Sequence, residues 1–358
     1  MQNIMRGFCL IVVSLIVASC TTTADAGDER AKVVAIGDLH GDFAAYMELL
    51  KKAGLVDGRG RWSGGNAVFV QTGDIPDRGP ESLKIIRHLK ELQIQAAREG
   101  GKVLALVGNH EAMNVTGDLR YVHPGEYREF ASRKSERVRN RFYKTNRDAI
   151  ETAYLKRDPT LSRHAIREQW DSQTPLGMIE HQIAWGPSGE VGGWVASNPA
   201  VVIVGETLFV HGGVSEKYAA YSVDEINMMT TDALKTRALD PASIINDELG
   251  PLWYRGLIRR NEPTSDAIAA DTEISVTGTS LSMESETELI LRTYGVKLIV
   301  VGHTPSLSGI AAHYGNRLIQ IDTGISQHYG GTQSFLRIEN GVIIANDNGL
   351  ETIIGEHQ

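Results

Sequence analysis

Residues 32–41 read KVVAIGDLHG, an apolar run that leads directly into a short polar loop. The β-branched run predicts a buried strand, and the glycine after it marks the end of that strand. Behind the loop, apolar side chains recur at the three- and four-residue spacing of an amphipathic helix, at Phe43, Tyr46, Met47 and Leu50. This stretch therefore predicts a strand, a polar loop and a helix in succession.

The same unit recurs twice more along the chain. A predicted strand at residues 67–70 leads into Gly73 and Asp74, and a helix over about residues 81–98 follows Pro80. A third strand at residues 102–107 leads into GNHE at residues 108–111. Repeated strand–loop–helix units indicate an α/β fold whose polar loops gather at the carboxyl ends of the strands.

Strand character returns in the second half of the chain. Residues 201–204 and 207–210 predict a hairpin whose second strand ends at His211, and residues 297–301 predict a strand that ends just before Gly302 and His303. An Asn-Gly pair within residues 336–344 predicts a final hairpin.

The segment from about residue 116 to residue 194 breaks this rhythm. It is polar, and we predict a mainly helical insertion that lies over or beside the site. It carries a run of cations at Arg133, Lys134, Arg137, Arg139, Arg141, Lys144 and Arg147. We interpret this run as a solvated helix face, with a specific groove for anions as the alternative.

The polar loops carry residue types that bind metal ions. Asp38 and His40 are two residues apart in a segment expected to be extended, so that both side chains leave on one side. Asp74 can bridge two cations through its two oxygens. The full predicted set is Asp38, His40, Asp74, Asn109, His211 and His303. Oxygen and nitrogen ligands without thiolate favour manganese, iron or zinc over calcium or an iron–sulfur centre.

Three motifs in order resemble a known family. GDLHG at residues 37–41, GDIPDRG at residues 73–79 and GNHE at residues 108–111 are similar to the signature motifs of the calcineurin-like metallophosphatases, and within them of the phosphoprotein phosphatases. The run NHEAMN at residues 109–114, continuing to GDLRY at residues 117–121, is most similar to the Shewanella-like branch.

This resemblance covers about residues 32–329 and includes His211-Gly212-Gly213 and Gly302-His303, which resemble the two later metal histidines of the family. It implies a metallophosphoesterase β-sandwich flanked by helices. It also implies two divalent metal ions (Mn, Fe or Zn). The first would be bound by Asp38, His40 and Asp74, and the second by Asp74, Asn109, His211 and His303.

The resemblance further implies the catalytic roles. His110 would be the general acid, and Asp77 would orient it. Arg78 would bind the phosphoryl group, together with Asn109. Arg255 is the best candidate for a second phosphate-binding arginine, with Arg259 and Arg260 near enough to compete.

The implied reaction is hydrolysis of a phosphomonoester. Two cations about 3.5–4 Å apart lower the pKa of a shared water, so that a bridging hydroxide attacks phosphorus. The Shewanella-like branch implies a protein phosphatase with a leaning towards phosphotyrosine. A serine/threonine preference does not carry over, because residues 321–326, Thr304 and Pro305 depart from the animal and fungal serine/threonine enzymes.

Two other functions stay open. The same ligand set would serve hydrolysis of a nucleotide or a dinucleoside polyphosphate. A metal-stabilised scaffold that has lost catalysis is disfavoured, because His110, Asp77 and Arg78 are all present. The chain has 358 residues and a formal net charge of −8, so nothing in its overall charge favours a nucleic-acid partner. We expect a phosphorylated protein or a small phosphoester as substrate.

The first residues predict export. Residues 8–17 form an apolar run that is too short to span a bilayer and is typical of a secretory signal. The run ends in Val17-Ala18-Ser19-Cys20, which resembles a bacterial lipoprotein cleavage box. We therefore expect a signal peptide over residues 1–19, a lipidated Cys20, a tether over residues 20–30 and a location at the periplasmic face of a membrane. Ordinary signal cleavage after Ala26, giving a soluble periplasmic protein, and an uncleaved anchor are the alternatives.

Overall fold

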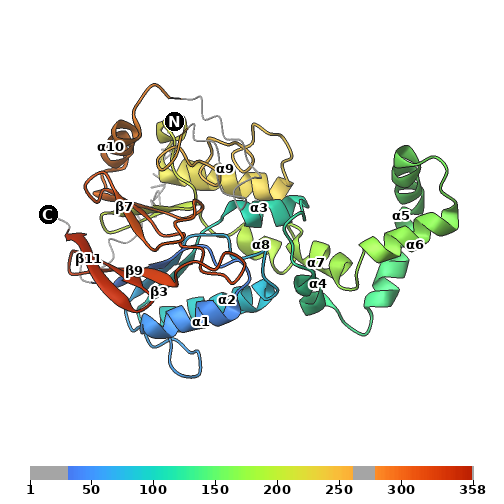
Figure 1. Cartoon of the computed structure of the whole chain (residues 1–358), viewed down its shortest axis with the longest axis horizontal. Helices are drawn as coiled ribbons and strands as arrows, with labels where there is room; N and C mark the ends of the chain where they lie inside the picture. Colours follow the sequence, from blue (N-terminus) through green and yellow to red (C-terminus); the bar gives the residue numbers. More distant parts are fainter. Residues whose placement is uncertain (1–30, 261–278, 357–358) are drawn as a thin grey trace, which may run out of the picture.

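A computed structural model describes residues 31–260 and 279–356 of the chain. The predicted signal peptide, Cys20 and the tether lie outside these residues. In the described part, two β-sheets pack face to face and helices cover their outer faces (Figure 1). The predicted β-sandwich flanked by helices is therefore confirmed.

The first sheet contains the strands of the three strand–loop–helix units predicted from the sequence. Its six strands lie in the order β11-β10-β9-β1-β2-β3, and β1, β2 and β3 are parallel. The strands are β1 (Val33–Ile36), β2 (Val68–Gln71), β3 (Lys102–Ala105), β9 (Ser334–Glu339), β10 (Val342–Asp347) and β11 (Leu350–Glu356). The predicted C-terminal hairpin is β9 with β10, and it joins the sheet antiparallel to β1.

The second sheet has five strands in the order β4-β5-β6-β8-β7. They are β4 (Val201–Val204), β5 (Thr207–Val210), β6 (Leu298–Val301), β7 (Ala311–His313) and β8 (Leu318–Gln320). β4 and β5 form the predicted hairpin, and β5 runs parallel to β6. The loops after β5 and β6 therefore leave the same edge of this sheet.

Successive side chains along the strands point to opposite faces of the sheet and so belong to two separate layers of the core. Ala35, Val70 and Leu106 face the second sheet, where they pack in one buried cluster with Phe209 and Val300. The neighbouring residues on these strands, such as Val34 and Phe69, belong to the core beneath the helices. Because successive side chains of a strand point to opposite faces, strands buried on both faces read as continuous apolar runs.

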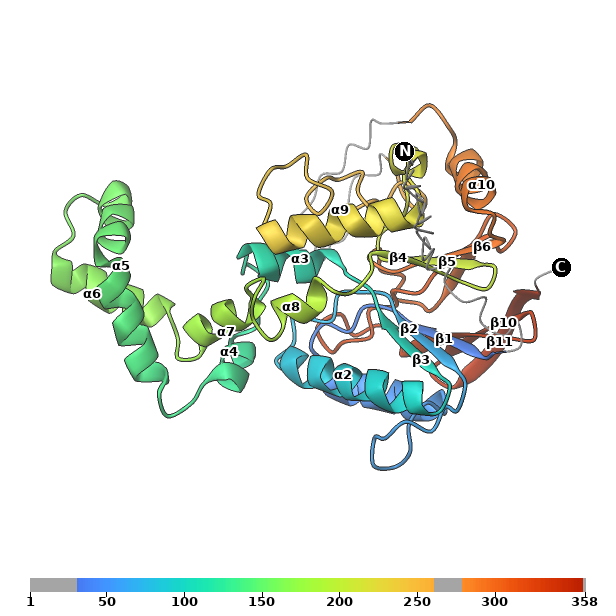
Figure 2. The ribbon, with the colours of Figure 1, turned by 180° about the vertical axis from the view of Figure 1, so that it is seen from behind.

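Helices cover both outer faces of the sandwich. α1 (Phe43–Lys52) and α2 (Ser82–Arg98) lie along the first sheet, and α9 (Val223–Thr236) lies on the side of the second (Figure 2). α3 (Asn109–Thr116), the short helix η1 (Tyr218–Ala220) and α10 (Met283–Tyr294) complete this part of the fold. No helix in residues 31–260 or 279–356 is long and apolar enough to cross a membrane.

The predicted insertion is helical. It comprises α4 (Pro124–Phe130), α5 (Ser135–Arg157), α6 (Arg163–Gln173), α7 (Met178–Trp185) and α8 (Gly192–Val195). α4 and α7 lie next to the sandwich, whereas α5 and α6 project sideways away from it (Figures 1 and 2). Of the predicted basic run, all but the half-buried Arg139 are exposed. This agrees with a solvated helix face.

Candidate metal centre

The loops that follow β1, β2, β3, β5 and β6 meet at one edge of the sandwich. Each loop contributes a polar side chain, and all of these side chains are buried. The residues brought together are Asp38, His40, Asp74, Asn109, His110, His211 and His303. Parallel strands place their carboxyl ends together, which is why residues more than 260 positions apart, such as Asp38 and His303, come into contact.

Asp38 and His40 meet for a different reason from the one predicted. His40 has a φ of 43°, so the chain turns there instead of staying extended. Its backbone N–H donates to the Asp74 carbonyl over 3.0 Å, which fixes the turn against the next loop. The His40 Nε2 then lies 4.0 Å from Asp38 Oδ2. The two side chains converge as expected, but the expected extended backbone was wrong.

Asp74 lies at the centre of the cluster. Its Oδ2 is 3.9 Å from His40 Nε2, and its Oδ1 is 3.3 Å from His211 Nε2. Two groups of residues could each hold a metal ion: His40, Asp74 and His110, and Asp74, His211 and His303. Asp74 belongs to both groups, which is the position required of a bridging carboxylate. His110 was predicted only as an acid, but it also lies close enough to His40 and Asp74 to belong to the first group.

The hydrogen bonds of the imidazoles fix which ring nitrogen faces the centre. His40 Nδ1 lies 3.1 Å from the Pro76 carbonyl, and His211 Nδ1 lies 2.9 Å from the Thr72 carbonyl. A carbonyl oxygen only accepts, so each Nδ1 carries the proton and donates it. The Nε2 lone pairs are thereby left to face the other ligands. Histidines that bind metals are oriented in this way by a carbonyl behind the ring.

His303 is oriented the other way round. Its Nε2 donates to the Trp253 carbonyl over 3.1 Å, so Nδ1 is the nitrogen available to a ligand. Like His40 it has a positive φ, 64°. Burial, followed by the charge of Arg255, holds the pKa of His303 well below its ordinary value. The ring is therefore neutral, the form that binds metals.

The residues present fit a cation. In the tautomer that carries its proton on Nδ1, His211 presents the Nε2 lone pair 3.0 Å from Asn109 Oδ1 and 3.3 Å from Asp74 Oδ1. Three electron-pair donors facing one another repel unless positive charge lies between them. Burial, followed by the charges of Asp322 and Asp74, raises the pKa of Asp38 well above its ordinary value. A bound cation would relieve this crowding of buried carboxylates.

His110 and Asp77 form a buried pair beside the cluster. His110 Nδ1 donates to Asp77 Oδ2 over 2.6 Å, and the other Asp77 oxygen accepts a hydrogen bond of 2.9 Å from Asn114 Nδ2. Burial alone would lower the pKa of His110, but the charge of Asp74 and the hydrogen bond that His110 donates to Asp77 raise it. Its Nε2 faces Asp74 Oδ2 at 3.9 Å. His110 can therefore hold a proton at Nε2 at the edge of the candidate metal site.

Glu111, which received no role from the sequence, holds the loops in place. Its carboxylate accepts hydrogen bonds of 2.9, 2.8 and 2.7 Å from the backbone N–H groups of Asp74, Ile75 and Gly108. Burial, followed by the charge of Asp74, raises its pKa to about 7. The signals in the sequence were its place in the GNHE motif and its position as the third residue of a helix.

Asp322 is a second residue that the sequence did not assign. It follows β8, and burial raises the pKa of its carboxyl to about 6. Its charge acts on both Asp38 and Arg255. Nothing in the spacing of residues 321–326 marked it, because the strand before it has only three residues.

Arg78 faces the cluster between two tyrosines. The Arg78 guanidinium carbon lies 4.2 Å from the centre of the Tyr121 ring and 5.7 Å from that of Tyr329. Among the described residues its buried Nε has no hydrogen-bond partner. A guanidinium that is held in place and still has donor capacity suits an anion.

Arg255 reaches the cluster. Its Nη1 donates to the His303 carbonyl and lies 3.4 Å from Thr304 Oγ1. Burial, followed by the charge of Arg259, lowers its pKa to about 10. Arg260 instead pairs with the buried Glu286 and donates to the Gly256 carbonyl, so it is already engaged.

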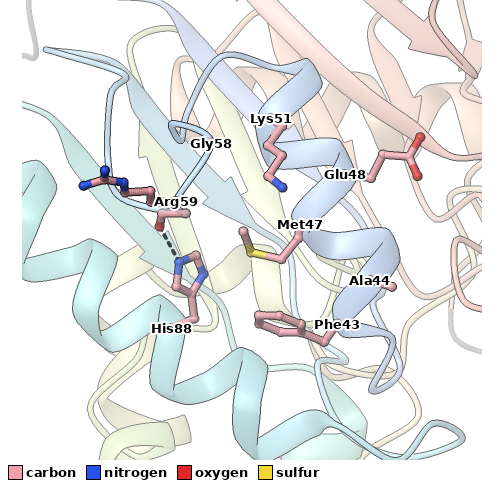
Figure 3. A pocket seen from close by; sticks show the side chains of 9 residues that line it. Phe43, Ala44, Met47, Glu48, Lys51, Gly58, Arg59 and His88 are labelled. Atoms are coloured by element: carbon pink, nitrogen blue, oxygen red, sulfur yellow. Dashed lines mark hydrogen bonds between the residues drawn. The ribbon is translucent and has the colours of Figure 1, made fainter.

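A surface pocket elsewhere contains none of these residues. It measures about 560 Å³ and is lined by residues of α1, the loop at residues 58–60 and His88 (Figure 3). His88 accepts a hydrogen bond of 3.0 Å from the Tyr46 hydroxyl and donates one of 2.7 Å to the Gly60 carbonyl. Its ring therefore ties α2 to α1 and to that loop, a structural role.

Comparison with known proteins identifies the relatives of this chain. Residues 31–307 match the family model described as calcineurin-like phosphoesterase. A protein of Schizosaccharomyces pombe is 32% identical over 316 residues, covering 86% of this chain and 76% of that protein. Shewanella-like protein phosphatase 2 of Arabidopsis thaliana is 31% identical over 330 residues, covering 90% of this chain and 79% of that protein. This chain is also similar to the crystal structure of a cold-active protein-tyrosine phosphatase of a psychrophilic Shewanella species. The sequence identity is 26% and the TM-score is 0.64, and the match covers 91% of this chain and 81% of that one.

Proposed function

The chain belongs to the calcineurin-like phosphoesterase family, with Shewanella-like protein phosphatases among its relatives, and from this premise we propose that it removes phosphate from phosphotyrosine in proteins. It is a metal-dependent phosphatase, and the proposal concerns its substrate, its two metal ions and the roles of its residues. The observation that carries the proposal is the position of Asp74. It belongs to both ligand groups and lies 3.9 Å from His110, which pairs with Asp77.

We assign Asp38, His40 and Asp74 to one divalent ion, and Asp74, Asn109, His211 and His303 to the other. Such ions, when bound, make water nucleophilic near neutral pH and hold phosphoryl oxygens. The hydrogen bonds to the Pro76, Thr72 and Trp253 carbonyls support this assignment, since they aim one nitrogen of each ring at the centre.

His110 protonates the leaving oxygen of the ester. Its Nδ1 stays bonded to Asp77, so the proton that it gives up comes from Nε2. Asp77 keeps the ring in one orientation and stabilises its charged form, and Asn114 keeps Asp77 in place. The chain needs no covalent phosphoenzyme, because attack by water gives the products in one step.

Arg78 and Arg255 bind the phosphoryl group from two sides. Arg78 has unused donor capacity, and Arg255 is anchored to the carbonyl of a predicted metal ligand. Forked hydrogen bonds from a guanidinium neutralise charge that builds up on phosphoryl oxygens.

The preference for tyrosine is supported by the surroundings of Arg78. The rings of Tyr121 and Tyr329 flank its guanidinium, and they also lie 5.2 Å from His110 and 5.3 Å from His40 respectively. A flat aromatic leaving group can pack against such rings. The similar Shewanella structure is that of a protein-tyrosine phosphatase, which supports the same preference.

A substrate panel tests the proposal. The purified chain, loaded with manganese, is offered matched phosphotyrosine, phosphoserine and phosphothreonine peptides and diadenosine tetraphosphate. We expect kcat/KM to be highest on the phosphotyrosine peptide. A higher value on the dinucleotide would replace the proposal with its main alternative, and a higher value on phosphoserine would remove the tyrosine preference.

We also propose that the chain is exported and anchored through a lipid on Cys20. The apolar run at residues 8–17 and the small residues before Cys20 support this. Mass spectrometry of the N-terminal peptide from bacterial membranes tests it. We expect a diacylated Cys20 at the new N-terminus, and cleavage after Ala26 would contradict the proposal.

A further inference from the structure

The turn that carries Asp77 and Arg78 is held in an unusual conformation. Asp77 has a φ of 72° and Arg78 a φ of 65°, so two successive residues with side chains adopt the left-handed region. Residues with a Cβ rarely do this, and such strain persists only where surrounding contacts enforce it. Yet this turn must aim one side chain at His110 and the next at the phosphoryl group.

The contacts that enforce the turn come from the start of the insertion. The Asp77 N–H donates to Glu126 Oε1 over 3.3 Å, and the Arg78 N–H donates to the Tyr121 carbonyl over 2.9 Å. The ring of Tyr121 also covers the Arg78 guanidinium. Both strained peptide groups are therefore bound by residues 121–126, a segment more than forty residues further along the chain.

Glu126 is built into this contact. It is 1% exposed, and its Oε1 also accepts a hydrogen bond from the Ser82 hydroxyl at the start of α2. Gly125 before it has no room for a side chain, because a Cβ there would lie 2.4 Å from Pro80 Cβ. This close approach of α4 to Pro80 brings Glu126 within reach of the turn.

We propose that residues 121–126 are a positioning device for the catalytic turn, and that Glu126 is the residue through which the insertion sets the geometry of the Asp77–His110 pair. The hydrogen bonds of Glu126 go to the Asp77 N–H and the Ser82 hydroxyl, and neither residue is among the assigned metal ligands. Glu126 acts through Asp77, whose N–H it binds. The inference rests on the proposed function, since it concerns the residue that orients the general acid.

Glu126 binds the turn in its neutral form. Burial, followed by the charge of Asp77, raises its pKa to about 8, and the charge of Glu129 on the same helix adds to this rise. From α2 Glu126 accepts the hydrogen bond of the Ser82 hydroxyl. Glutamine, which is neutral and keeps the acceptor oxygen, should therefore replace it well.

Two esters with different leaving groups test the proposal. A misplaced general acid matters for phenyl phosphate, whose leaving oxygen needs a proton, and much less for p-nitrophenyl phosphate. We expect Glu126→Ala to lower kcat on phenyl phosphate by about tenfold or more while p-nitrophenyl phosphate loses at most about threefold. Glu126→Gln should restore the wild-type ratio, and Gly125→Ala, which displaces α4, should resemble Glu126→Ala.

Glu129→Ala is the matched control, because Glu129 is an exposed residue on the same helix. It should keep the wild-type ratio of the two esters. If Glu126→Ala also keeps that ratio, or loses both activities equally together with its thermal unfolding midpoint, the proposal is wrong and Glu126 is merely structural.

A readout without turnover separates this inference from the proposed function. The proton in the short Nδ1–Oδ2 hydrogen bond between His110 and Asp77 should resonate far downfield in the proton NMR spectrum of the zinc-loaded protein. We expect that resonance to persist in Glu126→Gln and to disappear in Glu126→Ala. If the downfield resonance persists in Glu126→Ala, the inference is wrong whether or not the chain is a phosphatase. If the resonance behaves as expected in all three proteins but the wild type has no phosphatase activity, only the proposed function is wrong.

Discussion

His110 Nδ1 and Asp77 Oδ2 lie 2.6 Å apart in a pair that is buried beside the candidate metal centre. The other oxygen of Asp77 is bound by Asn114, so the carboxylate cannot rotate without losing a hydrogen bond. The pair is therefore fixed before any substrate arrives, and the mechanism predicts that its removal affects leaving-group protonation rather than metal binding.

Replacing His110 with Asn should lower turnover far more than it lowers metal content. General acid catalysis contributes about 10²–10⁴-fold, so kcat on an alkyl or phenyl phosphate should fall by about that factor. Steady-state kinetics with metal analysis of the same sample measures this. His164→Asn, which changes an exposed histidine of α6, should behave as wild type. Undiminished activity on the alkyl ester would remove His110 from the acid role.

Asp74→Asn should lose metal and activity together. The amide keeps the shape of the side chain but removes the charge that both ligand groups share. Elemental analysis after dialysis, with activity measured in parallel, distinguishes this variant from Asp148→Asn, a change on an exposed residue of α5. Full metal occupancy in Asp74→Asn would contradict the bridging assignment.

Arg78→Lys should weaken phosphate binding, because lysine cannot form the forked hydrogen bond of a guanidinium. We expect the inhibition constant for inorganic phosphate to rise by about tenfold, or about 1.4 kcal/mol. Arg260→Lys offers the matched comparison. Since Arg260 pairs with Glu286, this change should lower the thermal unfolding midpoint and leave phosphate inhibition unaltered. If Arg260→Lys weakened phosphate inhibition and Arg78→Lys lowered only the thermal unfolding midpoint, Arg260 and not Arg78 would be the phosphate-binding arginine.

Stability should fall in mild acid because of His181. This ring is fully buried among aromatic rings including Tyr127, Phe130 and Trp185, and neither ring nitrogen has a partner among the described residues. Burial lowers its pKa from 6.5 to about 4. Between these values the unfolded chain binds a proton that the folded chain excludes, so the full stability is present above pH 6.5 and declines towards pH 4.

The loss attributable to His181 should reach up to about 3 kcal/mol at the acid end of this range. Urea unfolding of the wild type and of His181→Phe at several pH values measures it. The phenylalanine variant should show a shallower decline, because its ring cannot take up a proton. Parallel pH profiles for the two proteins would show that other groups cause the loss.

The centre of the fold was predictable because β1, β2, β5 and β6 are short, mostly buried and followed closely by glycine and polar residues. Asp38, Asp74 and Asn109 come after the parallel strands β1, β2 and β3. Their side chains therefore had to meet at one edge of the sheet. The hairpins at β4–β5 and β9–β10 followed from turn residues. The three-residue strands β7 and β8 escaped prediction because three residues are too few to show an alternation.

The site was predictable in its residue types but not in its supports. Motif residues lie next to one another in the sequence, whereas Glu126 reaches Asp77 across 49 positions and no local spacing announces that contact. The left-handed turns at His40, Asp77 and Arg78 were equally hidden, since none of these residues is glycine.

The most direct test of the central claim is a metal titration of the wild-type chain. The protein is stripped with a chelator, and hydrolysis of a phosphotyrosine peptide is followed as Mn²⁺ is added, with bound metal measured at each step. We predict no activity without metal and full activity as binding approaches two ions per chain. Undiminished hydrolysis by the stripped protein would contradict the account.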